Sequence, residues 1–239
     1  MPSRLKCNLV LMTNTICDRI ENLIKEIRTS ERQAGRSPGS VKLLAVSKKH
    51  PSAAIREAIL CGQQHFGEHY APKMAQKCGE IGQDAAKWHF IGPLQSNKTA
   101  IVARHAHWCH TIDRLKIARR LSEQRPDELP DLQLCIEVNI DNEESKAGVQ
   151  PSDVEALAHE IAALPRVNLR GLMCIPQSSD ESARRRDSFA RLRQLQETLI
   201  RSGFELDTLS MGMSADYHEA IEEGATIVRI GTAIFGPRQ

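Results

Sequence analysis

The feature that most constrains the fold is a regular alternation of short apolar segments with longer amphipathic ones, from residue 42 to the C-terminus. Segments of near-continuous apolarity, such as Leu132 to Ile140, are typical of parallel strands covered on both faces. The amphipathic segments fit helices that connect and cover such strands. The expected strand and helix pairs are 42–47 with 52–61, 64–67 with 70–81, 87–91 with 96–104, 108–111 with 113–124, 132–140 with 152–163, 168–174 with 182–201, 207–209 with 215–223, and 226–230 with a short terminal turn.

The number of these units decides between two architectures. An open, doubly wound sheet shows the same alternation, and periodicity alone does not separate it from a closed barrel. The chain has 239 residues and eight units, which match a (β/α)8 TIM barrel of roughly 250 residues. We therefore predict an α/β protein whose fold is a TIM barrel.

The segment ahead of the first strand predicts an additional N-terminal helix. Ile16, Ile20, Leu23 and Ile27 recur at helical spacing, and the pattern stops at Gly35. No linker, low-complexity segment or change of composition divides the chain, so we expect one domain over residues 1–239. Residues 1–11 have no clear periodic role, and we expect them to be a dispensable extension.

Charge balance and hydropathy narrow the class of partner. The chain carries 32 basic and 30 acidic residues, a net charge of +2. This balance predicts no field that would attract nucleic acid or an anionic membrane. The apolar run from Leu9 to Met12 is far too short for a signal peptide or a membrane span. We expect a soluble, cytoplasmic monomer whose partner is a small molecule.

Cysteines and histidines suggest neither a disulfide framework nor a metal site. The seven cysteines are odd in number and form no CxxC pair, so we expect reduced, mostly buried thiols. His105, His107, Cys109 and His110 cluster in the sequence, but they span a helix end and a strand. Because alternation sends neighbouring strand side chains to opposite faces, we expect no metal there.

Two Gly/Ser-rich turns near the C-terminus predict a phosphate site. Ser210 and Ser214 follow the strand at 207–209, while Gly231 and Thr232 follow the strand at 226–230. In a TIM barrel, the loops after strands 7 and 8 commonly hold phosphate, using close backbone approach, hydroxyl groups and N–H groups at a helix start. Ordinary helix capping is the alternative for such residues.

A lysine and an arginine indicate which kind of ligand this phosphate site binds. Lys48 follows the apolar run 41–47, where it is suited to attack an aldehyde as a free amine, whereas Lys49 should point the opposite way on an extended chain. Arg229 lies two residues before Gly231; it either faces a ring nitrogen or forms a core salt bridge. A phosphate site facing a strand-end lysine suggests pyridoxal phosphate (PLP).

Several motifs together resemble one family. These are LLAVSKKHP, FGEHY, WHFIGPLQSNK, WCHTIDR, NIDNEESKAG, RGLMCIP and LSMGMSADYHEAIEEGATIVRIGTAIFG. Over residues 14–237 the chain resembles the pyridoxal 5′-phosphate homeostasis protein family, single-domain relatives of the alanine racemase N-terminal barrel. The resemblance implies that PLP is bound covalently as an aldimine on Lys48. It also implies Ser210, Ser214, Gly231 and Thr232 around the phosphate, with Arg229 near the pyridine nitrogen.

Further residues are assigned by position or depart from the family pattern. Asn139, expected to close the fifth strand, is placed to contact the cofactor ring. Met211 and Met213 either flank the cofactor or fill the core. His50 and His69 stand where family members commonly carry lysine and asparagine. Lys146 is either a secondary acceptor of the cofactor or a solvated lysine.

Three functions remain open on the sequence. The first is a PLP-binding protein of intracellular PLP homeostasis that holds the cofactor on Lys48 for buffering or delivery, with PLP-dependent apo-enzymes as candidate recipients and no catalytic residues. The second is a small PLP-dependent amino-acid racemase or lyase. The third is an aldolase-like barrel that binds a phosphosugar. A related racemase needs a second base and a second domain, and the barrel uses the whole chain, so we favour the first.

Overall fold

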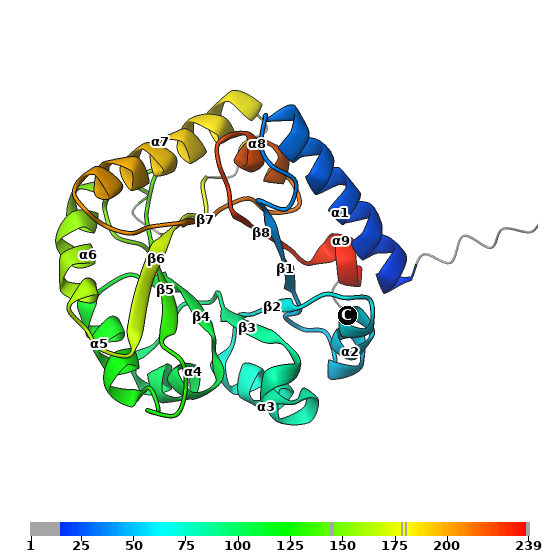
Figure 1. Cartoon of the computed structure of the whole chain (residues 1–239), viewed down its shortest axis with the longest axis horizontal. Helices are drawn as coiled ribbons and strands as arrows, with labels where there is room; N and C mark the ends of the chain where they lie inside the picture. The colour runs from blue at the N-terminus through cyan, green and yellow to red at the C-terminus, as the bar shows by residue number, and fades with distance from the viewer. Residues whose placement is uncertain (1–14, 144–145, 178, 180, 238–239) are drawn as a thin grey trace, which may run out of the picture.

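The apolar segments form eight parallel strands that close on themselves, with helices around the outside (Figure 1). The structure is a computed structural model that describes residues 15–143, 146–177, 179 and 181–237. The predicted extension, residues 1–11, lies outside them. The strands are β1 (Lys42–Val46), β2 (His65–Glu68), β3 (Lys87–Phe90), β4 (Trp108–Ile112), β5 (Leu132–Glu137), β6 (Val167–Met173), β7 (Thr208–Ser210) and β8 (Ile227–Ile230).

Pairing between the first and last strands settles the architecture. β1 pairs with β8 in parallel, with Leu43 opposite Val228 and Ala45 opposite Ile230. Strand order around the barrel follows the sequence from β1 to β8. The predicted TIM barrel is confirmed, and an open sheet is excluded. Because every strand runs the same way, all eight carboxyl ends meet at one mouth of the barrel.

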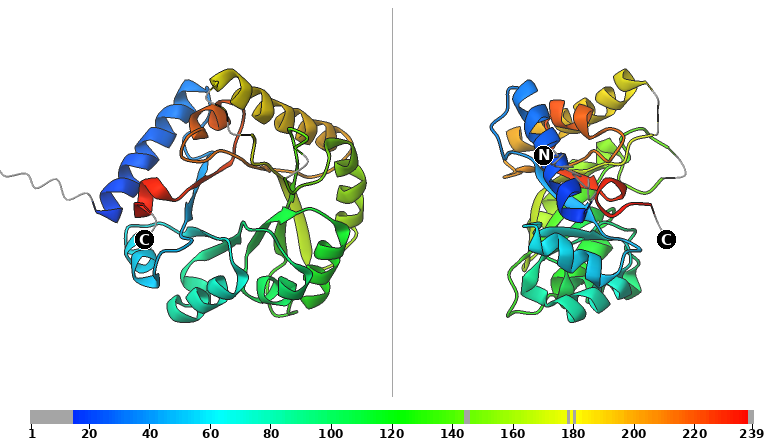
Figure 2. Two further views of the ribbon diagram at one scale, coloured as in Figure 1. Left: turned by 180° about the vertical axis from the view of Figure 1, so that it is seen from behind. Right: turned by 90° about the vertical axis from the view of Figure 1, so that its right-hand side faces the viewer.

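The predicted N-terminal helix is also present. It begins at a capping box, in which the Thr15 hydroxyl accepts from the Asp18 N–H and the Asp18 carboxylate accepts from the Thr15 N–H. This helix lies across the outside of the barrel against α2, α8 and α9 (Figure 2). The helices are α1 (Ile16–Gln33), α2 (Ser52–Leu60), α3 (Ala71–Ile81), α4 (Thr99–His105), α5 (Leu115–Gln124), α6 (Val154–Ala162), α7 (Ser182–Arg201), α8 (Tyr217–Glu222) and α9 (Thr232–Phe235).

Four of the predicted strands end earlier than expected, and β5 shows the largest difference. β1 ends at Val46, and β5 ends at Glu137 rather than at residue 140. After Val138, whose N–H still donates to the Met173 carbonyl of β6, the chain leaves the sheet: Val138 makes an isolated bridge to Val149, and the Asn139 N–H donates to the Val149 carbonyl. The sequence stays mostly apolar up to residue 140, so composition alone does not show where the strand ends. Asn139 therefore lies in a loop and does not close a strand.

The expectation that the cysteines are reduced is wrong for one pair. Cys17 and Cys61 form a disulfide, with their Cα atoms 5.4 Å apart, a usual separation for this bond. The contact arises because the first turn of α1 packs beside the end of α2, which no sequence spacing reveals. The free cysteines of the described chain are all buried: Cys78, Cys109, Cys135 and Cys174.

None of the described helices is long and apolar enough to span a bilayer. In the same described residues, no group of three or more histidine, cysteine, aspartate or glutamate side chains could hold a metal ion. The clustered histidines of residues 105–110 separate in the fold. His107 accepts from the Trp88 N–H, whereas His110 lies fully buried inside the barrel.

Candidate functional site

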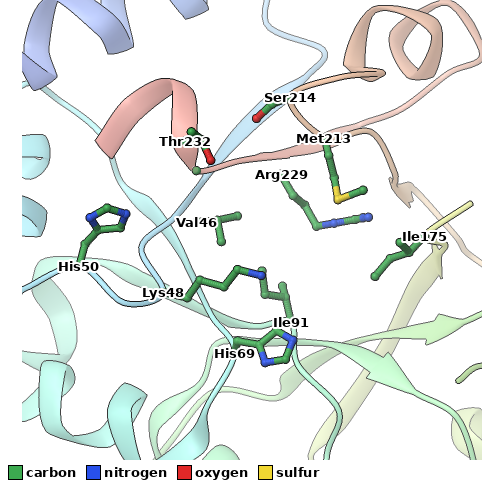
Figure 3. Close-up of a pocket in the computed structure, with 11 residues that line it drawn as sticks. Val46, Lys48, His50, His69, Ile91, Ile175, Met213, Ser214, Arg229 and Thr232 are labelled. Carbon is green, nitrogen blue, oxygen red and sulfur yellow. The ribbon is translucent and has the colours of Figure 1, made fainter. Parts of the chain in front are cut away.

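A cavity of about 180 Å³ lies where the strands end, at the carboxyl mouth of the barrel. Lys48, Ser214, Arg229, Gly231 and Thr232 all line it. Figure 3 shows the Lys48 amine and the Arg229 guanidinium entering the same space, with the hydroxyl-bearing Ser214 and Thr232 at its edge. Five residues singled out in the sequence, from both ends of the chain, thus share one cavity.

Lys48 reaches the cavity from a turn, not from a strand. The turn follows β1, and the His50 N–H donates to the Ser47 carbonyl at 3.1 Å. Lys49 has a left-handed backbone with φ of 67°, and its side chain lines a neighbouring groove. The two lysine side chains do point in different directions, as predicted. The cause is the backbone of the turn, and not alternation along a strand.

A buried polar network fixes the backbone beside Lys48. Ser47 donates from its hydroxyl to Glu68 at 2.6 Å, and its carbonyl accepts from the Lys77 ammonium at 2.9 Å. Lys77 and Glu68 form an ion pair of 2.5 Å, with side chains only 8% and 1% exposed. The residue before the lysine is therefore held at both its side chain and its carbonyl.

Arg229 forms the floor of the cavity. Its guanidinium donates to the Ser210 hydroxyl at 2.9 Å, to the Ser210 carbonyl, and to the Cys174 carbonyl at 2.8 Å. These acceptors are two carbonyls and a hydroxyl, so the core salt bridge considered from the sequence is not what the structure contains. Burial lowers the pKa of Arg229, but an arginine remains charged in proteins.

Close backbone approach shapes the hydroxyl-bearing edge. A Cβ atom on Gly231 would lie 2.9 Å from the Val46 carbonyl oxygen, so only glycine fits where β8 leaves the barrel beside β1. Gly212 has φ of +91°, and a Cβ there would lie 2.6 Å from the Ala220 Cβ. Asp216 accepts from the Met213 N–H at 2.6 Å and so holds the loop that carries Ser214.

Two of the residues predicted at the site do not line the cavity. Ser210 is fully buried behind Arg229, and its hydroxyl is bonded to Arg229 and His110. Asn139 uses its amide within its own loop, donating to the Glu143 carbonyl at 2.8 Å and accepting from the Glu143 N–H at 3.1 Å. Neither side chain is among those that line the cavity.

Met211, Met213 and Lys146 lie in three different environments. Met211 is fully buried in the core, whereas Met213 is 36% exposed and lines the cavity. Lys146 pairs with Glu143 at 2.5 Å and donates to the Pro176 carbonyl at 3.1 Å. Lys146 thus links the loops after β5 and β6 instead of extending into solvent.

Four further residues contribute to the wall. Ile91 and Ile175 line the cavity just beyond the ends of β3 and β6. Their positions directly after two strands are the sequence signal that places them at this mouth of the barrel. His50 and His69 also line it. His50 stacks on Phe235 with ring centroids 5.1 Å apart, which ties the lysine turn to α9.

A carboxyl group near Arg229 is electrostatically unusual. Glu137, the last residue of β5, is 9% exposed. Burial, together with the charge of Asp113, raises the pKa of Glu137 to about 7, against the opposing effect of Arg229. Near neutral pH this carboxyl group therefore exists in both protonation states.

Comparison with known proteins assigns the chain to a family. Residues 19–239 match the family model described as alanine racemase, N-terminal domain. Fold and site thus define a barrel of the alanine racemase N-terminal type. The chain is 51% identical over 225 residues to the pyridoxal phosphate homeostasis protein of Pseudomonas aeruginosa, covering 94% of this chain and 96% of that one. For the protein of Escherichia coli K12 the identity is 47% over 228 residues, with coverage of 94% and 97%. The chain belongs to the pyridoxal phosphate homeostasis protein family.

Solved structures agree with this assignment. PipY of Synechococcus elongatus PCC7942, in a structure with PLP bound, is 36% identical and superposes with a TM-score of 0.82, covering 93% of this chain and 100% of that chain. The alanine racemase of Corynebacterium glutamicum is only 17% identical, with a TM-score of 0.67 and coverage of 91% and 61%. That second likeness concerns the fold alone.

Proposed function

We propose that this protein binds PLP in the cavity at the barrel mouth and takes part in PLP homeostasis. Lys48 would hold the cofactor through a Schiff base, with its phosphate at Ser214, Gly231 and Thr232. The observation that carries the proposal is the presence of Lys48, Arg229 and these phosphate donors in one cavity. The PLP-bound structure of the relative PipY supports it.

The residues present fit the cofactor chemically. Two hydroxyls and a glycine that allows close backbone approach match a phosphate group. Arg229 uses three of its five N–H groups within the protein, so two remain for an acceptor such as a ring nitrogen. A permanently charged donor beside that nitrogen keeps it unprotonated, which weakens the ring as an electron sink.

The same geometry supports a holding function over amino-acid turnover. The chain has two tyrosines, and these are the tyrosine candidates for a second base. Tyr217 donates to Glu26 of α1 at 2.6 Å, on the outside of the barrel. Tyr70 is 54% exposed and lines the neighbouring groove. We infer that bound PLP is stored and passed to apo-enzymes, and that the protein acts as a monomer.

Absorption spectroscopy tests the binding. Protein incubated with PLP and freed of excess should show a visible band that Lys48→Ala abolishes. Lys49→Ala is the matched control, because it removes an adjacent lysine outside this cavity, and it should keep the band. A wild-type protein that stays colourless refutes PLP binding.

A second measurement separates storage from catalysis. Loaded protein is incubated with individual L-amino acids in deuterated water, and α-proton exchange is followed by NMR. We expect no exchange above that of free PLP. Rapid exchange that disappears in Lys48→Ala would instead establish the racemase or lyase alternative.

A further inference from the structure

Three histidines form a hydrogen-bonded row across the inside of the barrel. His65 begins β2, at the mouth opposite the cavity, and its Nδ1 lies 2.9 Å from Nε2 of His89 on β3. Nδ1 of His89 lies 2.8 Å from Nε2 of His110 on β4. The interior of a TIM barrel is ordinarily filled by branched aliphatic side chains, so this polar row calls for a separate explanation.

The row ends at the floor of the cavity. Nδ1 of His110 lies 2.8 Å from the Ser210 hydroxyl, which also accepts from Arg229 at 2.9 Å. His89, His110 and Ser210 are all at most 1% exposed. Trp108 stacks on His89 with ring planes 8° apart and fixes the middle ring. An unbroken set of contacts thus joins the far mouth of the barrel to Arg229.

All three rings are neutral near pH 7. Burial is the largest cause in each case: it lowers the pKa of His65 to about 4 and that of His110 to about 3, and it lowers the pKa of His89 well below its usual value. A neutral imidazole has one N–H donor and one acceptor nitrogen. Each histidine can therefore donate on one side only, and the row must have a direction.

Arg229 determines that direction. A guanidinium only donates, so the Ser210 hydroxyl accepts from it and has one hydrogen of its own to give. Nδ1 of His110, 2.8 Å from the hydroxyl oxygen, can accept that hydrogen. His110 then carries its proton on Nε2 and donates to His89, which donates from Nε2 to His65 in the same way. The opposite direction would leave the Ser210 hydrogen without this acceptor.

We propose that His65, His89 and His110 are positioning residues that form a one-directional hydrogen-bonded relay, which orients the Ser210 hydroxyl and through it holds Arg229 for the cofactor. The relay itself depends only on contacts within the protein. Its effect on PLP rests on the proposed function above. Mutual polarisation along such a row strengthens each hydrogen bond. Loss of the hydrogen bond at the His65 end should therefore weaken the hydrogen bond between Ser210 and Arg229.

The direction of the relay can be measured without any ligand. In ¹⁵N-labelled protein at pH 7, two-bond ¹H–¹⁵N NMR spectra distinguish the two neutral tautomers of each histidine. We expect His65, His89 and His110 all to carry the proton on Nε2. Ser210→Ala should leave the protein folded, with the His89 and His65 rings in place, but it should change the ¹⁵N chemical shifts of His110. An Nδ1–H tautomer or a charged ring at any of the three positions overturns the relay.

The link to the cofactor has its own test. His65→Leu removes the far end of the relay without touching the cavity, and we expect it to weaken PLP binding about fivefold, the effect of one net hydrogen bond. His159 is exposed on α6, so His159→Ala is the control and should bind PLP as wild type does. Added PLP should also shift the His65 nitrogens of the wild type but not those of His159.

The possible failures are distinguishable. Equal PLP affinity for His65→Leu and His159→Ala, with a wild type that binds PLP, refutes the positioning role. A wild type that ignores PLP refutes the proposed function instead, and the tautomers then decide whether the relay exists. If His65→Leu does not fold, the PLP-induced shift of the wild-type His65 nitrogens decides the coupling.

Discussion

Replacement of Lys77 by methionine probes the network that fixes the lysine turn. Lys77 neutralises Glu68, whose side chain is 1% exposed, and donates to the Ser47 carbonyl beside Lys48. Methionine keeps most of the unbranched apolar stem of the side chain but removes the charged end. Glu68 then keeps only the Ser47 hydroxyl as a donor among these contacts.

The size of the effect follows from burial. Removal of one partner of a buried ion pair costs about 3–5 kcal/mol, because the other charge stays desolvated. Glu68→Gln in the Lys77→Met background removes that stranded charge, and we expect it to recover about half of the loss, a coupling of about 1–3 kcal/mol. Loss of the bond to the Ser47 carbonyl also loosens the Lys48 turn, so the single variant should retain PLP less well.

Urea denaturation followed by circular dichroism measures the free energy of unfolding. Lys73→Met on the same helix is the matched control, because Lys73 is exposed and bonds only to Gln76 in the described contacts; it should change stability by less than about 0.5 kcal/mol. If Lys77→Met costs no more than Lys73→Met, then the buried pair does not stabilise this end of the barrel, and our account of the lysine turn is wrong.

Three other predictions follow from the same site. The raised pKa of Glu137, about 7, means that the folded state binds the Glu137 proton more tightly than the unfolded state does, so this residue lowers stability as pH rises from about 4.5 to 7. By urea titration, Glu137→Gln should match wild type at pH 4.5 and be up to about 3 kcal/mol more stable at pH 8. An equal difference in stability at both pH values contradicts the raised pKa. Gly231→Ala places a Cβ 2.9 Å from the Val46 carbonyl oxygen and should cost about 1–3 kcal/mol of stability by urea denaturation. Gly79→Ala, with open space around it, is the control and should stabilise α3 in the same assay. Thr232→Val keeps the shape but loses one phosphate donor, so the PLP dissociation constant should rise about tenfold or more by equilibrium dialysis; an unchanged constant would remove Thr232 from the phosphate site.

Much of the fold was predictable because eight apolar segments admit few parallel arrangements. Placement of Lys48, Ser214, Gly231 and Thr232 at one mouth followed from closure of the barrel, since all strands end there. Closure is a global property, and the β1–β8 pairing that proves it leaves no local trace in either strand.

Local contacts place several residues differently from what the sequence pattern indicated. Asn139 was assigned to the site because the segment 132–140 is apolar throughout most of its length, yet its amide caps a loop. Ser210 was assigned to the phosphate, but inward alternation on β7 sends it to Arg229. The Cys17–Cys61 disulfide depends on how α1 packs against α2, and the histidine relay depends on contacts between three strands. Such contacts are tertiary, so no sequence window contains them.

The central claim is that Lys48 carries PLP, and chemical trapping tests it most directly. Protein loaded with PLP is treated with borohydride, which fixes a Schiff base as a stable amine, and the tryptic peptides are examined by mass spectrometry. We predict one phosphopyridoxyl group per chain, on Lys48, and none on Lys49. A label spread over surface lysines, or carried by Lys146 with Lys48 unmodified, would contradict the account.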